Sequence, residues 1–134
     1  MLYQLIITDR ELSYDSHMES FNIGLFRSRE EAERTAAFYL SRVKGFCDYP
    51  CTYEIHERVV YGETLEINDV FIAVGWNTNE NDDEIDIIES PCFVSESQAC
   101  AALQQMKKDY PRAEWAVDRW RLDRAEWSEG FIRD

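Results

Sequence analysis

The feature that most constrains this chain is an internal repeat. Phe26-Arg27-Ser28 and Phe93-Val94-Ser95 each open a helix pattern, and the apolar residues that follow recur at the same offset. A repeat of this length is a supersecondary unit rather than a short solenoid motif. The apolar matches are Ala32 with Ala99, Ala36 with Leu103, Tyr39 with Met106, and Val43 with Tyr110.

The first copy predicts the order strand, strand, helix, strand. The helix begins at the capping box Ser28-Arg29-Glu30-Glu31, in which the serine oxygen accepts a backbone N–H and Glu31 reaches back to the cap. Lys44-Gly45 supplies a basic last turn and a C-cap. The expected strands are Leu2–Thr8, Phe21–Leu25 and Thr52–Tyr61, with a polar loop over Asp9–Glu19.

The second copy repeats this order. Its helix begins at a second capping box, Ser95-Glu96-Ser97-Gln98, with glutamine in the place of the acid. In the strand Glu84–Glu89, strict alternation puts Ile85 and Ile87 on one face. The expected strands are Val70–Trp76, Glu84–Glu89 and Trp115–Leu122, with a loop over Asn77–Asp83.

These patterns predict an α+β fold. The third strand of each copy pairs antiparallel with the first, so the tandem ββαβ repeat gives a mainly antiparallel sheet of about six strands with two helices packed on one face. Residues 62–68 are too few for a flexible linker between independent domains. We therefore predict one compact domain over 1–134, with repeat copies at 1–61 and 69–134.

The charge is strongly acidic: 27 Asp and Glu against 14 Lys and Arg give a net charge of −13. No Lys or Arg lies between Arg58 and Lys107. Such a field repels nucleic-acid phosphates and anionic membranes and attracts basic surfaces. We expect no nucleic-acid or membrane partner. The acidic field either serves solubility alone, which is the simpler interpretation, or attracts a basic protein partner.

The N-terminus has neither the basic start nor the small-residue cleavage site of a signal peptide, and no stretch approaches the roughly 18 apolar residues of a membrane helix. We therefore expect a cytoplasmic protein with reduced thiols. Two loose cysteine pairs are a weak zinc pattern, and no phosphate-binding loop is present, so we predict no metal and no cofactor. The cysteines are Cys47, Cys51, Cys92 and Cys100.

Two stretches resemble a family of small bacterial domains that has no established activity. They are Gly45-Phe46-x-Asp48-Tyr49-Pro50-x-x-Tyr53-x-Ile55, preceded by Ile23-Gly24-Leu25-Phe26, and the close Trp127-x-Glu129-Gly130-Phe131. The resemblance covers most of the chain and implies a fold and a bacterial source rather than a function. The first copy lacks the tryptophan close, and the second lacks the Gly-Phe before Tyr110-Pro111.

Few residues are suited to catalysis, which needs positioned acids, bases or nucleophiles. His17 falls in the polar loop, where we expect it to be solvated. Glu54, His56 and Arg58 share one face of a strand, as an acid–base set or, as we favour, a solvated salt-bridged face. No motif supports a Cys-His nucleophile, so we predict no catalytic residue and favour a protein without enzyme activity.

The acidic stretch Asn77–Glu84 resembles a calcium loop in its alternating oxygens. The EF-hand template fails, however, because Asp82 takes the glycine position and Ile88 the position of the last glutamate. We predict a solvated hairpin loop.

Large apolar residues lie on both faces of the last strand, Trp115 on one and Trp120 on the other. Tryptophan interleaved with arginine, here Arg119 and Arg121, is typical of interface centres. We favour the simpler interpretation, in which the C-terminal tail folds back through Trp127 and Phe131 and buries the Trp120 row.

The leading hypothesis is a non-enzymatic acidic protein-interaction module, an inhibitor or immunity-like binder of a basic partner. One alternative is a small enzyme or ligand-binding domain that uses the cleft between the copies, with His56, Glu54 and the cysteines. Another is a homodimer formed through the Trp120 face. The predicted acidic face is Glu80, Asp82, Asp83, Glu84 and Asp86; the predicted aromatic contact is Trp76, Trp120, Trp127 and Phe131.

Overall fold

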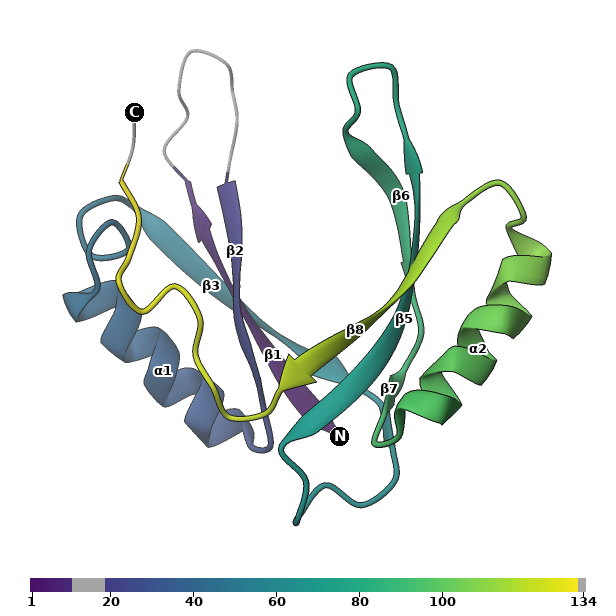
Figure 1. Cartoon of the computed structure of the whole chain (residues 1–134). Coiled ribbons are helices and arrows are strands. Elements are labelled where there is room, and N and C mark those ends of the chain that lie inside the picture. Colours follow the sequence, from purple (N-terminus) through teal and green to yellow (C-terminus); the bar gives the residue numbers. More distant parts are fainter. Residues whose placement is uncertain (11–18, 133–134) are drawn as a thin grey trace. The chain divides into compact units, whose positions relative to one another are not determined.

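The part of the chain that the structure describes is an α+β fold with two helices and mainly antiparallel strands (Figure 1). The computed structural model describes residues 1–10 and 19–132. Two compact units are present: unit 1 comprises Met1–Arg58 with Leu122–Asp134, and unit 2 comprises Val59–Arg121. These boundaries differ from the expected repeat boundaries, because the end of the chain belongs to unit 1.

In unit 1 the helix is α1 (Arg29–Arg42) and the strands are β1 (Leu2–Asp9), β2 (Glu19–Phe26) and β3 (Cys51–Arg58). In unit 2 the helix is α2 (Glu96–Asp109) and the strands are β4 (Val60–Tyr61), β5 (Asp69–Thr78), β6 (Glu84–Glu89), β7 (Cys92–Phe93) and β8 (Glu114–Arg121).

Unit 1 is a three-stranded sheet in the order β2-β1-β3, with α1 packed on one face. Both neighbours of β1 run antiparallel to it, which confirms that the third strand pairs with the first. The apolar positions spaced at helical intervals on α1 are buried against the sheet. The core is Leu5, Ile7, Phe21, Ile23, Phe26, Ala32, Ala36, Tyr39, Val43, Phe46 and Phe131.

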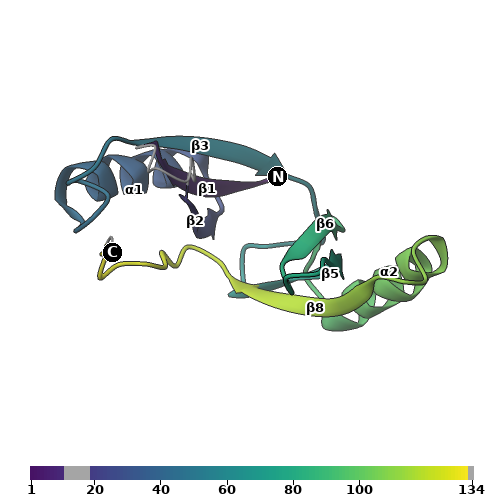
Figure 2. The same cartoon turned by 90° about the horizontal axis from the view of Figure 1, so that it is seen from above.

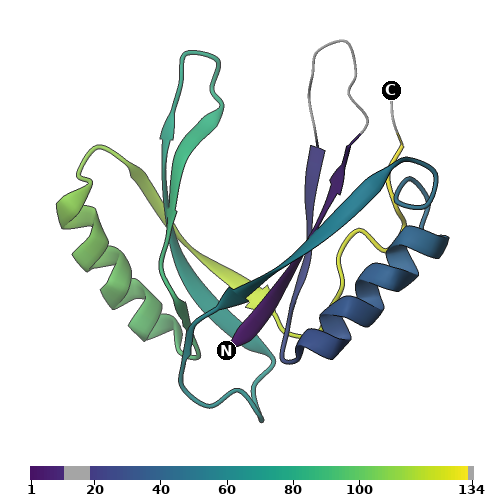
Figure 3. The ribbon, with the colours of Figure 1, turned by 180° about the vertical axis from the view of Figure 1, so that it is seen from behind.

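The end of the chain packs on unit 1 as a strap over Leu122–Ile132. Leu122 forms a parallel bridge with Leu25, and the Phe131 N–H donates to Lys44 O at 3.1 Å. Figure 3 shows this segment running beside α1. Phe131 fits there because Gly45, at φ 86°, has no Cβ; one would lie 2.6 Å from the Phe131 ring.

Unit 2 has β5 at its centre, with β8 on one side and β6 and β7 on the other. Figure 2 shows α2 beside this sheet. The Trp115 indole lies over Gly75 and donates from Nε1 to Tyr110 O, the C-cap residue of α2, at 3.3 Å. The face of Gly75 and Trp115 is therefore the face that α2 covers.

Within residues 1–10 and 19–132 the strands form two sheets, of three and five strands, rather than one sheet of about six. The expected strand Thr52–Tyr61 is the point of division. Cys51–Arg58 pairs with β1, whereas Val60 and Tyr61 pair in parallel with β7. Two successive stretches that read as one strand thus pair with different partners.

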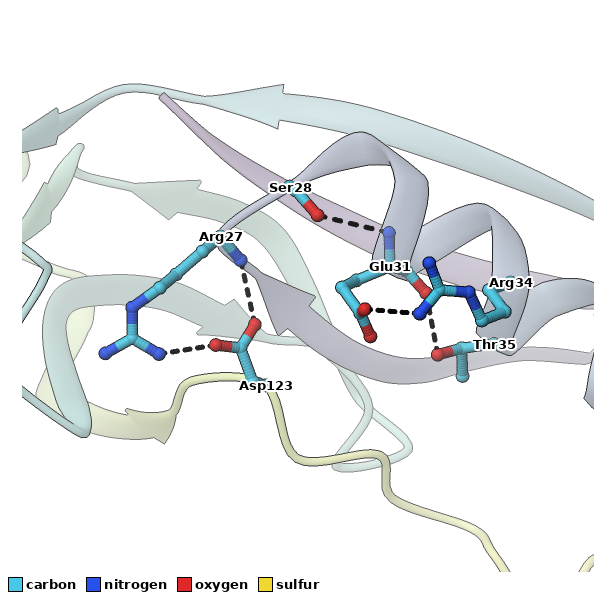
Figure 4. A network of polar contacts seen from close by, with 6 residues as sticks. All are labelled: Arg27, Ser28, Glu31, Arg34, Thr35 and Asp123. Carbon is cyan, nitrogen blue, oxygen red and sulfur yellow. Dashed lines mark hydrogen bonds and ion pairs between the residues drawn. The ribbon is translucent and has the colours of Figure 1, made fainter.

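Both helices begin at the predicted serine caps. Ser28 Oγ accepts from the Glu31 N–H at 3.2 Å, and Ser95 Oγ accepts from the Gln98 N–H at 3.3 Å. The reciprocal half of the first capping box differs from expectation, since the Glu31 carboxylate pairs with Arg34 at 2.6 Å (Figure 4). The C-cap of α1 is Val43, just before the predicted Lys44-Gly45.

Candidate functional site

The β5–β6 hairpin ends in a loop that Asn79 organises. Its Oδ1 accepts from the N–H groups of Asn81 at 2.8 Å and Asp83 at 3.0 Å, and its own N–H donates to Asp83 O at 3.0 Å. This Asx turn confirms the predicted hairpin loop. It leaves the whole predicted acidic face exposed: Glu80, Asp82, Asp83, Glu84 and Asp86.

A β-bulge corrects the predicted faces of β6. The register pairs Ile88 with Gly75 and Ile85 with Asn77, so Asp86 and Ile87 both lie opposite Trp76. Asp86 adopts the left-handed conformation at φ 53°, which aspartate tolerates better than most residues. The extra residue moves Ile85 onto the Ile88 face, and Ile85 and Ile87 therefore lie on opposite faces.

Ile85 and Ile87 are large apolar residues at the surface, 39% and 57% exposed. They share the strand β6, which is the last strand in the order β4-β7-β5-β6. Because the two side chains lie on opposite faces of the sheet, the surface that adjoins both of them is the outer edge of β6. Acidic side chains flank them, since Glu84 and Asp86 are exposed on the same strand.

The four residues of the predicted aromatic contact belong to different units. Trp76 and Trp120 are half-buried in unit 2, whereas the rings of Trp127 and Phe131 lie 4.9 and 4.6 Å from that of Phe21 in unit 1. The tail thus packs on the unit 1 core, and burial of the Trp120 row by the tail stays a prediction. Phe131 is only 9% exposed and acts as a core residue.

The polar face of β3 carries a hydrogen-bonded His–Glu pair and an arginine bound to a neutral amide. His56 Nε2 lies 3.0 Å from Glu54 Oε2, and Arg58 Nη1 donates to Gln4 Oε1 at 2.8 Å. Both His56 and Glu54 are exposed. His17 lies outside the described residues.

Cys51 does not form a nucleophilic site with His56. Cys51 is five residues from His56 on β3, about 16 Å along an extended strand, and on the opposite face. Slight desolvation and the neighbouring Asp48 carboxylate, 3.7 Å from Sγ, raise the pKa of the Cys47 thiol. A thiol held protonated in this way is a poor nucleophile.

Other candidate sites are sparse among residues 1–10 and 19–132. Within these ranges no group of three His, Cys, Asp or Glu side chains is placed to hold a metal ion. A surface hollow of ≈ 290 Å³ in unit 2, at the end of α2, is lined by Asn77 and by residues 109–113 and contains no nucleophile–base pair. The cleft between the two copies stays a prediction.

Neither helix in the described part of the chain is long and apolar enough to cross a membrane. No protein-family model, curated protein or solved structure matches this chain.

Proposed function

We propose that the chain is an acidic protein-interaction module that binds a basic protein partner, in the manner of an inhibitor or immunity protein. The single observation that carries this proposal is the exposure of Ile85 and Ile87 on an edge strand whose other exposed side chains are acidic. The acids steer a basic partner to the strand, and the isoleucines supply apolar contact. We also propose a bacterial source and a cytoplasmic location, both of which are expectations from the sequence.

An interaction role is favoured over catalysis by what surrounds each candidate group. His56 pairs with an exposed glutamate, and Cys47 is held as a thiol. The exposed isoleucines of β6, in contrast, leave apolar area in water that a partner would cover.

The test is capture from a lysate of the source cell, followed by purification of the captured protein and titration calorimetry. Glu80→Lys/Glu84→Lys is the informative variant, because both side chains are exposed and neither residue has a left-handed backbone. Glu30→Lys/Glu33→Lys on the exposed side of α1 is the matched control, since it changes the net charge equally.

We expect the hairpin variant to weaken binding at least tenfold at low salt and the control to change it by less than about threefold. Equal effects of the two variants would mean that only the net charge matters, and the acidic hairpin would then serve solubility.

A further inference from the structure

We infer that the outer edge of β6 binds its partner by strand addition, and that the occupant is an extended segment in which basic and apolar residues alternate. This inference rests on the proposed function and specifies how the partner is held. In this mode backbone hydrogen bonds give affinity and alternate side chains give specificity.

The ladder leaves backbone groups of β6 directed outward. The Ser90 N–H donates to Ala73 O at 2.9 Å, and Ile88 pairs with Gly75 two positions earlier. Because hydrogen bonds in an antiparallel pair alternate, the peptide groups of Ile88 turn toward β5 and the carbonyl of Ile87 turns to the outer edge. Among the described strands, β6 pairs only with β5.

Side chains on both faces of β6 would meet an added strand. Ile85 lies on the face that carries Gly75 and α2, and Ile87 lies on the other. An added strand places its residues on both faces in turn, so each isoleucine gains a cross-strand neighbour. A partner that covered one face alone would reach only one of them.

The other long edge strands are less suited to a basic segment. On β3, exposed groups of both signs are engaged with each other or with α1, as in Glu54 with His56 and Arg29 with Glu57. The exposed residues of β8 include Arg119 and Arg121. The edge of β2 contacts the strap through Ile23 and Leu25.

The charge also argues against a second copy as the occupant. Two β6 strands paired edge to edge would bring Glu84 and Asp86 of each copy against acids of the other, and like charges in facing positions destabilise a strand pair. With a segment that has lysine or arginine at alternate positions, the facing charges are opposite and attract each other. The acids thus exclude self-pairing and select a basic strand.

The experiment uses the full chain and two capped peptides of about eight residues, the length of a common strand. One alternates lysine and valine. The other has the same sequence with N-methyl groups on alternate backbone nitrogens, which removes the donors of one edge and keeps the charge. Binding is followed by amide NMR shifts and hydrogen exchange at low and high salt, in the natural chain, Glu80→Lys/Glu84→Lys and Glu30→Lys/Glu33→Lys.

We expect the unmodified peptide to shift the β6 amides, to slow their exchange and to bind at least tenfold more tightly than the methylated one. Equal, salt-sensitive binding of both peptides would overturn strand addition and leave the acidic module in place. Binding of neither peptide would overturn both. Concentration-dependent protection of β6 without peptide would assign the edge to a second copy and overturn the inference.

Discussion

Asp123 holds Arg27 through both of its carboxylate oxygens. Oδ1 accepts from the Arg27 backbone N–H at 2.9 Å, and Oδ2 forms an ion pair with the Arg27 guanidinium (Figure 4). Arg27 directly precedes Ser28, the N-cap of α1, and Asp123 is the second residue of the strap. This contact therefore fixes the end of the chain to the start of a helix far away in sequence.

Asp123→Ala should destabilise unit 1 by about 1–3 kcal/mol, because it removes an acceptor for a backbone N–H together with a charged hydrogen bond. Asp123 also has φ 57°, a conformation that alanine adopts less readily than aspartate or asparagine. Asp123→Asn keeps one acceptor and this backbone preference and should cost less. Native-state hydrogen exchange of β1, with β5 amides as the internal reference, measures both. Equal losses of stability in the two variants would contradict a role for the side-chain oxygen that accepts from the Arg27 N–H, because asparagine retains such an oxygen.

Phe131→Ala should cost roughly 3 kcal/mol, the usual scale for a buried phenylalanine. The ring stacks on Phe21 at 4.6 Å and meets Phe46 at 4.8 Å, so its removal opens a cavity in unit 1. Ile132→Ala is the matched control, because Ile132 is 73% exposed, and should stay within about 0.5 kcal/mol. Urea unfolding followed by circular dichroism gives both values. A loss below about 1 kcal/mol for Phe131→Ala would show that the strap does not complete the core.

Local signals predicted most of the secondary structure. The serine caps at Ser28 and Ser95 fix both helix starts, because a serine oxygen satisfies an orphan backbone N–H. The β-rich runs predicted the ends of the long strands to within one or two residues, except that the strand predicted to end at Tyr61 ends at Arg58. The antiparallel pairing of the third strand with the first followed from topology.

Local sequence signals did not predict which strand each segment pairs with, or where the tail packs. Val60 and Tyr61 were expected to extend the strand that is β3, yet they form a separate strand that pairs with β7. Trp127 and Phe131 indicate a tail that packs somewhere, but hydrophobic pattern does not specify which core accepts it. At the candidate site, acidity and exposure followed from composition. The bulge at Asp86 did not, since it depends on one residue adopting a left-handed backbone.

Tyr39 should make unit 1 sensitive to alkaline pH. Its hydroxyl donates to Glu126 O at 2.8 Å, and burial, followed by the Glu126 carboxylate, raises its pKa above 10.0. The folded state then keeps a proton that the unfolded state loses, so this stability is full below about pH 10 and is lost as pH rises through the folded pKa. Tyr39→Phe should cost about 1 kcal/mol at neutral pH and flatten the alkaline decline. Melting curves at about pH 8 and about pH 11 compare the natural protein with Tyr39→Phe. If stability falls with pH as steeply in the variant as in the natural protein, Tyr39 is excluded as the source of the alkaline decline.

The β6 bulge depends on the residue at Asp86. A β-branched side chain in the left-handed region is strained, so Asp86→Val should cost about 1–2 kcal/mol or shift the β5–β6 register. Asp86→Asn is the matched control, because it removes the charge, tolerates the same backbone and keeps an oxygen near Asn77 Nδ2, which lies 3.3 Å from Asp86 Oδ2. Cross-strand amide contacts between Gly75 and Ile88 report the register by NMR. If Asp86→Val leaves both register and stability unchanged, the bulge does not need a left-handed residue, and the opposite placement of Ile85 and Ile87 must have another cause.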